Sequence, residues 1–203
     1  MDYDKRMSNL VQKVGESFLD FIETIAVSLA IFLVIYQFFL QPHQVDGLSM
    51  VPNFQDKEFL LTDKITYKLR DPKRGEVIVF HAPPAANCVE GTGCDFIKRI
   101  IGLPGDQIEV KENAIWVNGQ KLLEDYIPEN FATEAHEATQ NKVITLASNE
   151  YFVCGDNRPY SSDSRRWGPI TRSEIVGRVF FRYWPVSAIG PIQHAQYPYN
   201  SLD

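Results

Sequence analysis

An uncharged, apolar run near the N-terminus, Ile25 to Leu40, limits more than any other feature what this chain can fold into. Phe18 to Ile22 extends the run with a single acid. A helix over Phe18–Leu40 rises about 1.5 Å per residue, which is enough to cross the roughly 30 Å hydrocarbon layer of a bilayer. Asp20 and Glu23 lie toward one end of the run, where they can reach the membrane interface. The sequence therefore predicts one membrane-spanning helix.

Two other interpretations of this run are a buried helix of a soluble domain and a cleaved signal peptide. A signal peptide would end in a small-x-small cleavage motif, whereas Gln41-Pro42-His43-Gln44 follows here. We therefore interpret the run as a retained anchor. Three basic residues precede it, Lys5, Arg6 and Lys13, and the next one after it is Lys57. This asymmetry predicts a cytoplasmic N-terminus and an extracytoplasmic remainder of the chain.

Composition and charge exclude several classes of protein. The 203 residues leave room for one globular domain beside the anchor, and 44% hydrophobic residues without a low-complexity tract indicate a folded chain. A formal net charge of −6 and the absence of a basic run argue against nucleic acid as the main partner.

After the anchor the sequence predicts closely spaced β-strands and no long amphipathic helix. Asn118-Gly119 is a strong signal for a two-residue hairpin turn. Strands without intervening helices favour a mainly β domain, an antiparallel sheet or open barrel. Glu124 to Asn141 is polar and acidic, and we expect it to be a surface excursion. The expected strands are Glu58–Tyr67, Glu76–His81, Phe96–Ile101, Gln107–Val110, Ala114–Val117, Gln120–Leu123, Val143–Leu146, Tyr151–Cys154 and Glu174–Tyr183.

The three cysteines have different surroundings. Cys88 and Cys94 flank a Gly-containing loop, and a short disulfide between them fits an oxidising compartment, although two free thiols remain the alternative. A zinc site would need two more ligands, and His81 alone does not supply them. Cys154 lies in an apolar run and is expected in the core.

The segment Gly47-Leu48-Ser49-Met50-Val51-Pro52 follows the predicted anchor closely. Gly47 and Pro52 suit a tight turn that exposes the Ser49 hydroxyl and directs backbone N–H groups at one point, as a tetrahedral oxyanion requires. Most surface turns with a serine have no such role, so this segment alone is weak evidence.

Lys98 lies in a predicted strand, Asp95 to Ile101. Alternation places it on one face with the apolar side chains of Phe96 and Ile100. An ordinary lysine, with a pKa of about 10.4, is protonated at neutral pH and cannot accept a proton from serine. Burial would destabilise the ammonium, and lowering the pKa to roughly 8 takes about 3 kcal/mol. Lys98 is thus either an edge lysine that reaches solvent or a base made usable by burial.

The segment Gly155 to Arg165 is dense in acids, arginines and hydroxyls. A solvated loop is one interpretation. Carboxylates that pair with guanidiniums, and a hydroxyl that orients a base, are the other. Arg99, next to Lys98, is expected to reach this cluster.

A Ser-His-Asp triad is the competing hydrolytic arrangement. Of the four histidines, His81 at the end of a strand is the one plausible base, and we expect nothing nearby to orient it. Metal-dependent hydrolysis is also not indicated, because HExxH is absent.

Taken together, these segments resemble the bacterial type I signal peptidases over nearly the whole chain after the anchor. Gly47-x-Ser49-Met50-x-Pro52 is similar to the nucleophile box of that family, and Phe96 to Asp106 to its lysine box. Gly155-Asp156-Asn157-Arg158 through Ser161, Asp163, Ser164 and Arg165 resembles its final box. Two further segments, Lys57–Lys64 and Arg74–Phe80, are similar to the parts between.

The resemblance implies a Ser/Lys dyad in which Ser49 is the nucleophile and Lys98 the general base. Ser161 is then expected to hydrogen-bond the lysine amine. Asp163 and Arg165, together with Arg99, are expected to form a salt-bridged support. No metal or cofactor is implied. The implied substrates are secretory preproteins, cut after a small-x-small motif, and the implied pocket residues are Val45, Met50, Val79 and Ile97.

Three departures from the family pattern stand out. Gly47 replaces a serine of many Gram-negative members, so the oxyanion would depend on backbone N–H groups, chiefly that of Ser49. The stretch Pro84 to Asp95 is long and contains Cys88 and Cys94. The connection between the lysine box and the final box is short, which predicts a reduced accessory region at about residues 107–149.

The expected organisation is a cytoplasmic tail at residues 1–17, an anchor at 18–41 and a β-rich peptidase domain at 42–203. The expected location is the bacterial cytoplasmic membrane, with the catalytic domain outside, lipid and preprotein as partners, and a monomeric state. A self-cleaving repressor with the same dyad is an alternative, but the apolar anchor stands where its DNA-binding domain would be. A non-catalytic membrane-bound β scaffold is another alternative, and it would have no need of the dyad.

Overall fold

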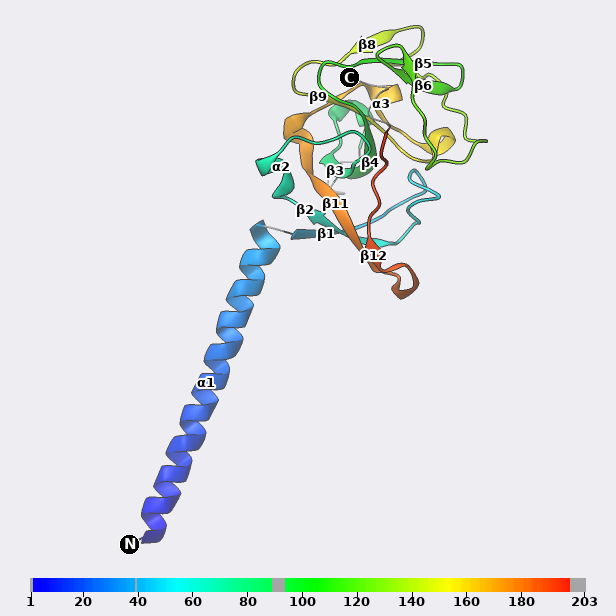
Figure 1. The fold of residues 1–203 in the computed structure, drawn as a ribbon. Coiled ribbons are helices and arrows are strands. Elements are labelled where there is room, and N and C mark those ends of the chain that lie inside the picture. The colour runs from blue at the N-terminus through cyan, green and yellow to red at the C-terminus, as the bar shows by residue number, and fades with distance from the viewer. Residues whose placement is uncertain (1, 39, 89–93, 198–203) are drawn as a thin grey trace. The chain divides into compact units, whose positions relative to one another are not determined.

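The computed structural model describes residues 2–38, 40–88 and 94–197, and the chain divides into two units at residue 40. The first unit is one continuous helix, α1 (Asp2–Phe38), shown in blue in Figure 1. Its segment Gly15–Val34 has a mean hydropathy of 2.0 and buries no surface in the protein, so it is long and apolar enough to span a membrane. The helix stops earlier than predicted, since Leu40 belongs to the first strand. Pro42 explains this, because Gln41, the residue before the proline, prefers extended backbone and so favours a strand here over a longer helix.

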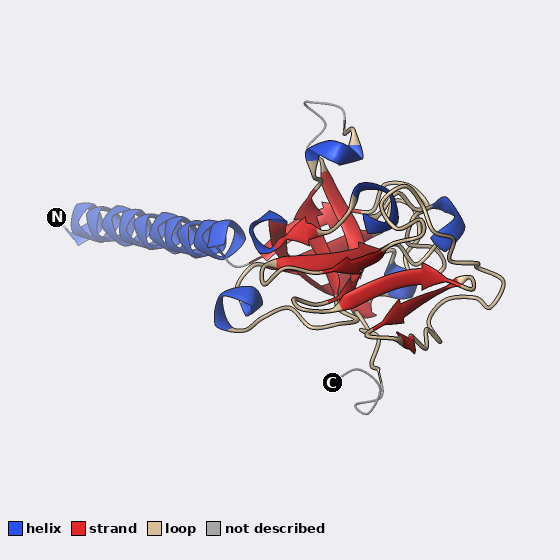
Figure 2. Ribbon diagram, turned by 90° about the horizontal axis from the view of Figure 1, so that it is seen from above, coloured by secondary structure: helices blue, strands red, loops and turns tan. Residues whose placement is uncertain are grey.

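The second unit is built mainly from antiparallel strands, as the sequence predicts (Figure 2). A larger sheet has the order β1-β2-β11-β3-β4-β9-β10, with β12 paired to β11, and a smaller sheet has the order β7-β6-β5-β8. The larger sheet contains β1 (Leu40–Gln44), β2 (Phe59–Asp63), β3 (Val77–His81), β4 (Asp95–Gly102), β9 (Glu150–Cys154), β10 (Ile170–Thr171), β11 (Ile175–Trp184) and β12 (Gly190–Pro191). The smaller one contains β5 (Gln107–Lys111), β6 (Ala114–Val117), β7 (Gln120–Lys121) and β8 (Val143–Thr145).

Helices in the second unit are single turns. They are the α-helices α2 (Thr66–Leu69) and α3 (Ser164–Trp167) and the 3-10 turns η1 (Pro84–Ala86), η2 (Arg158–Tyr160), η3 (Arg172–Glu174) and η4 (Val186–Ala188). The strand predicted over Glu58–Tyr67 is therefore too long. Its second half turns into α2 because the Asp63 carboxylate accepts hydrogen bonds from the amides of Ile65 (2.7 Å) and Thr66 (3.0 Å) and starts the turn.

The hairpin predicted at Asn118-Gly119 is present between β6 and β7. Both turn residues have positive φ, +51° and +79°, which is the backbone conformation that asparagine and glycine tolerate best.

Among the described residues of the second unit, three apolar clusters form the core. The first, between the two sheets, contains Ile101, Ile108 and Phe152. The second contains Ile78, Phe80 and Ile100, with Phe96 packed against it. The third contains Val45, Met50, Phe54, Val77 and Val79, with Ile97 packed against it. Strand β4 contributes to all three, which fixes its position among the strands.

The stretch from Glu124 to Asn141 is not the simple surface excursion that its polar sequence predicts. Thr133 and Thr139 within it are buried, with 2% and 1% exposure. Glu124 accepts hydrogen bonds from Arg158 at 2.7 and 2.5 Å. Polar residues are usually exposed, but these are paired inside the domain, which satisfies their hydrogen-bonding capacity.

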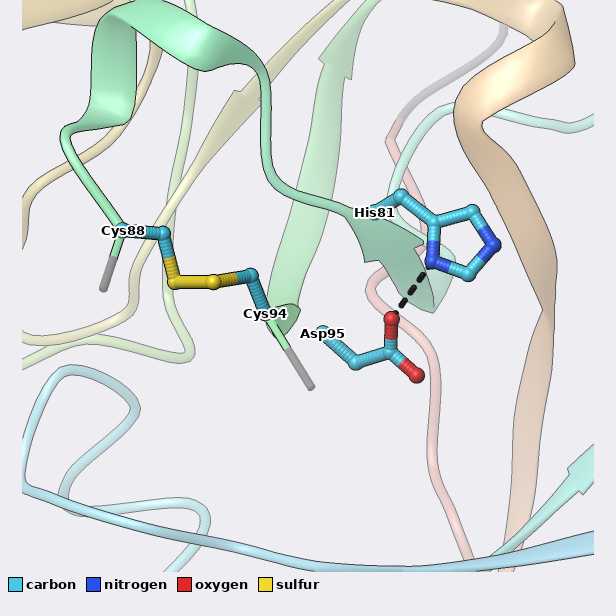
Figure 3. The surroundings of a disulfide bond; sticks show 4 residues. All are labelled: His81, Cys88, Cys94 and Asp95. Carbon is cyan, nitrogen blue, oxygen red and sulfur yellow. Dashed lines mark hydrogen bonds and ion pairs between the residues drawn. A yellow bond between two sulfur atoms is a disulfide. The ribbon is translucent and has the colours of Figure 1, made fainter. Parts of the chain in front are cut away.

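Cys88 and Cys94 form a disulfide just before β4 (Figure 3). The Ala82 amide donates to the Cys94 carbonyl at 2.8 Å, so the β3–β4 connection is closed at its base. Cys154 is a free thiol that is fully buried in the first core cluster, as predicted.

Candidate active site

The Ser49 turn is held in place by the apolar residues that follow the serine. Met50 and Phe54 are 1% and 2% exposed and pack into the third core cluster. The Phe54 amide donates to the Met50 carbonyl at 3.0 Å, and Gly47 has a φ of +91°. Ser49 itself is half-buried, so its hydroxyl lies at the surface of a turn that core packing holds rigid.

The segment after β9 holds the same turn from the other side. The Asn157 amide donates to the Ser49 carbonyl at 3.0 Å, and the Asn157 side chain donates to the Leu48 carbonyl at 2.9 Å. Gly155 allows this close approach, since a Cβ there would lie 2.4 Å from the Ser49 carbonyl oxygen.

Lys98 reaches Ser49 from β4. The distance between Lys98 Nζ and Ser49 Oγ is 2.8 Å, and Nζ also donates to the Ile97 carbonyl at 3.0 Å. Lys98 is 4% exposed, and its Nζ lies 5.3 Å from the centre of the Phe96 ring. Burial lowers the pKa of Lys98 to about 8, against the opposing effect of the Asp163 and Asp156 carboxylates. At pH 7 about a tenth of this lysine is therefore an uncharged amine, far more than for a lysine with the ordinary pKa.

Asp163 and Arg165 form a fully buried ion pair near the lysine. Arg165 donates from Nε and Nη2 to the two carboxylate oxygens at 2.8 and 2.9 Å. Burial alone would raise the pKa of Asp163, but the Arg165 guanidinium outweighs it and the pKa is lowered. Asp163 therefore stays ionised, and its charge favours a nearby cation.

Ser161 lies beside this pair but does not bond the lysine as expected. It is 3% exposed, and its hydroxyl is close enough to the Asp163 carboxylate to help lower the pKa of that group. It packs against Gly155, where a Cβ would lie 2.3 Å from Ser161 Oγ. The hydrogen bonds of Lys98 go to Ser49 and Ile97 instead.

Arg99 reaches the segment Gly155 to Arg165 as expected, but it forms a second buried ion pair there instead of joining the Asp163–Arg165 pair as the resemblance implies. Its Nε and Nη2 donate to Asp156 at 2.8 and 2.6 Å, and Nη1 donates to the Gly75 carbonyl at 3.0 Å. Asn53, in the Ser49 turn, also donates to Asp156 at 2.8 Å. Alternation explains the difference, because Arg99 faces away from Lys98 and reaches the opposite side of the sheet.

Sequence reasoning did not assign roles to Asp156, Asn53, Arg158 or Glu124. Asp156 and Arg158 were visible as charged residues directly after an apolar strand, where each buried charge needs a partner. The partners Asn53 and Glu124 are far away in the sequence and gave no signal of their own.

A cavity of about 300 Å³ opens at Ser49 and Lys98. Three of the four predicted pocket residues, Val45, Met50 and Ile97, line it. Val79 does not line it, and is instead fully buried in the core cluster behind these three. Leu48 and Tyr160, both largely exposed, also line the cavity.

The expectation that nothing orients His81 is wrong. Its Nδ1 lies 2.6 Å from a carboxylate oxygen of Asp95, directly opposite it in the β3–β4 register (Figure 3). The Ser49 hydroxyl nevertheless accepts its hydrogen bond from Lys98 Nζ. Among the residues described, no group of three or more His, Cys, Asp or Glu side chains could hold a metal ion.

Comparison with known proteins gives consistent matches. The family described as signal peptidase, peptidase S26, matches residues 18–184. A probable signal peptidase I-2 of Synechocystis sp. is 38% identical over 174 residues, which are 86% of this chain and 77% of the relative. Signal peptidase IB of Staphylococcus aureus is 35% identical over 181 residues, 83% of this chain and 91% of the relative. A crystal structure of a signal peptidase I from Enterococcus faecalis V583 aligns with a TM-score of 0.42 and 32% identity, covering 54% of this chain and 97% of that one.

Proposed function

The chain belongs to the signal peptidase family, peptidase S26, and on this premise we propose that Ser49 and Lys98 are its catalytic dyad. The protein is a signal peptidase and a hydrolase. The observation that carries the proposal is the 2.8 Å distance between Lys98 Nζ and Ser49 Oγ, with the lysine buried and its pKa lowered.

In the proposed reaction, uncharged Lys98 accepts the Ser49 proton while Ser49 Oγ attacks the carbonyl carbon of the scissile bond. The tetrahedral intermediate collapses when the C–N bond breaks and the Lys98 ammonium gives its proton to the departing amine. A water molecule, deprotonated by Lys98, then attacks the acyl-enzyme. The C–O bond to Ser49 breaks, Lys98 gives the proton back to Ser49 Oγ, and the signal peptide leaves with its new carboxyl end. Each step returns the lysine to the form that the next step requires.

Backbone N–H groups are the proposed donors to the oxyanion. Gly47 has no side chain and so supplies no hydroxyl to the oxyanion. The Ser49 amide donates to no backbone acceptor within residues 40–88 and 94–197, and so remains available for a developing negative charge.

The strand edges beside the cavity support binding of an extended substrate. The first half of β4 pairs with β3 on one side, whereas β9 pairs only from Arg99 onward on the other. Strand β1 pairs with β2 and ends the sheet. Each therefore has an open edge. The cavity is lined by Gln44 at the end of β1, by the turn at residues 45–50 and by Asp95–Lys98 of β4, and we call the space between these two edges the slot. We propose that the preprotein enters this slot as an added strand.

The proposed specificity for small side chains at positions −1 and −3 follows from the slot floor. Val45, Met50 and Ile97 supply an apolar floor, and Val79 supports it from the core. Because Val79 is fully buried, the floor has no room to recede under a large side chain.

The proposed arrangement in the cell is a tail at residues 1–17, a single span at 18–41 and an extracytoplasmic peptidase domain at 42–203, in the bacterial cytoplasmic membrane. The apolar segment Gly15–Val34 and the basic residues before it support this orientation. The Cys88–Cys94 disulfide supports an oxidising compartment. The small sheet β5–β8 is the proposed reduced accessory region, and the proposed partners are lipid and secretory preproteins, with the enzyme a monomer.

The test is cleavage of a preprotein by the full chain in detergent. We expect Ser49→Ala and Lys98→Ala to lose cleavage while they unfold at a temperature close to that of the parent. Two matched controls, Ser173→Ala and Lys121→Ala, change exposed residues of the same types and are expected to retain full activity. Near-normal cleavage by folded Lys98→Ala would refute the dyad.

A further inference from the structure

The slot between β1 and β4 is bridged by polar side chains. Asp95 begins β4, and its second carboxylate oxygen lies 3.5 Å from Nε2 of His43 in β1. These strands are not neighbours in the sheet, so this contact joins the two sides of the slot. Asp95 itself lines the cavity and its side chain is 25% exposed.

The position of the Asp95 carboxylate is fixed from three directions. His81 Nδ1 contacts one oxygen at 2.6 Å, and the Cys88–Cys94 disulfide ends at the preceding residue (Figure 3). The His43 ring contacts the other oxygen. A carboxylate held in this way meets a ligand without first losing side-chain freedom.

The negative charge of Asp95 is poorly compensated. Its ion-pair partners in the described residues are two histidines and no lysine or arginine. Burial lowers the pKa of His43, so this ring is uncharged at neutral pH, and its Nε2 has no hydrogen-bond partner in the described part of the protein. The other acid of the slot, Asp46, is by contrast paired with Lys57.

Strand geometry sets which substrate residue this charge can meet. Ile97 and Asp95 lie on the same face of β4, two residues or about 6.6 Å apart. If the side chains at −1 and −3 flank Ile97, then those at −3 and −5 flank Asp95, because side chains of an added strand alternate with the same period. The residue at −3 is small in the proposed substrate, so −5 is the first position with room for a long side chain.

We propose that Asp95 is a specificity-determining residue that favours lysine or arginine at position −5 of the preprotein and disfavours an acid there. The inference rests on the proposed function, since it uses the same slot, and it requires the preprotein to run parallel to β4. Partly exposed ion pairs are worth little each, so the expected difference in kcat/KM between lysine and glutamate at −5 is about three- to tenfold.

The experiment uses the full chain in detergent and one preprotein with alanine, lysine or glutamate at −5. We expect kcat/KM in the order lysine, alanine, glutamate, with differences that shrink as salt is raised from low to high concentration. Asp95→Asn is expected to abolish the order. The matched control Asp125→Asn removes one exposed acid elsewhere and is expected to keep it. The same substitutions at −4, whose side chain faces the other way, are expected to have less than a twofold effect.

Equal cleavage of all three substrates by the parent enzyme would overturn the inference while leaving the proposed function intact. Cleavage of none would instead count against the proposed function. An order that survives in Asp95→Asn but disappears in Asp46→Asn would show that Asp46, not Asp95, is responsible for the preference. A stronger effect at −4 than at −5 would contradict the strand geometry. The series on the parent enzyme decides the matter even if Asp95→Asn does not fold.

Discussion

Replacing Lys98 by methionine is expected to stabilise the protein while it abolishes cleavage. The lysine is 4% exposed, and its pKa is lowered from the ordinary 10.5 to about 8. At pH values below 8 the folded protein therefore holds a buried ammonium that the unfolded chain would hold in water. Methionine has a similar length, fills the same space and carries no charge.

The magnitude follows from the two pKa values. A difference of 2.5 pH units between 10.5 and about 8 corresponds to about 3 kcal/mol at 1.36 kcal/mol per unit. Because the folded pKa is lowered, the unfolded chain binds more protons between pH 8 and 10.5, and the parent gains stability as pH rises through that window. Lys98→Met should consequently exceed the parent by up to about 3 kcal/mol at pH 6.5, and by progressively less toward pH 10.

The assay is denaturant-induced unfolding of the full chain in detergent at pH 6.5, 8 and 9.5, followed by tryptophan fluorescence. Lys121→Met serves as the control. Because Lys121 is exposed, its replacement should change the free energy of unfolding by no more than about 0.5 kcal/mol at any of these pH values. A Lys98→Met protein no more stable than the parent at pH 6.5, or a stability gain independent of pH, would refute a buried lysine with a lowered pKa.

Three further predictions concern the scaffold. Arg158→Ala should destabilise the protein by about 3–5 kcal/mol, because Arg158 is fully buried and its loss leaves Glu124 unpaired; partial recovery on adding Glu124→Leu, measured by denaturant unfolding, checks the cause. Gly75→Ala should cost at least about 1 kcal/mol, because φ is +87° and a Cβ would lie 2.1 Å from a backbone oxygen of the C-terminal segment; an unchanged melting temperature would contradict this. Replacing Cys88 and Cys94 by serine should cost about 2 kcal/mol, as expected for opening a short loop, and thermal unfolding with and without a reductant measures it.

The central strands could be predicted from the sequence because their patterns are local. Apolar alternation located β4 and put Lys98 on the face of Phe96 and Ile100, both of which belong to or pack against the second core cluster. The turn at Asn118-Gly119 was also predictable, because few residues adopt the positive φ values that it needs.

The partners of the buried charges could not be predicted in the same way. Arg99 reaches the segment Gly155 to Arg165 as expected, but its partner there is Asp156 and not the Asp163 that the resemblance implies. Glu124 was expected at the surface but pairs with Arg158. Such pairs join residues separated by 57 and 34 positions, and sequence patterns carry no information at that range. Glu124 was therefore assigned to the surface by default, and the charges of the segment Gly155 to Arg165 could be expected to pair but not matched with their individual partners.

The surroundings of the histidines show the same limit. His81 had no visible partner in its own segment, yet the β3–β4 register places it opposite Asp95. The cross-strand pair follows once the register is known, and the register depends on how the two strands meet rather than on either strand alone.

The pH dependence of kcat/KM tests most directly whether Lys98 is the base. The base must be uncharged, so kcat/KM should fall about tenfold per pH unit below the lysine pKa and level off above it, with a midpoint at about pH 8. Lys98→Arg should have no measurable activity at any pH, because guanidinium stays protonated. A midpoint near 6.5, as a histidine would give, or retained turnover by Lys98→Arg would contradict the assignment of Lys98 as the base.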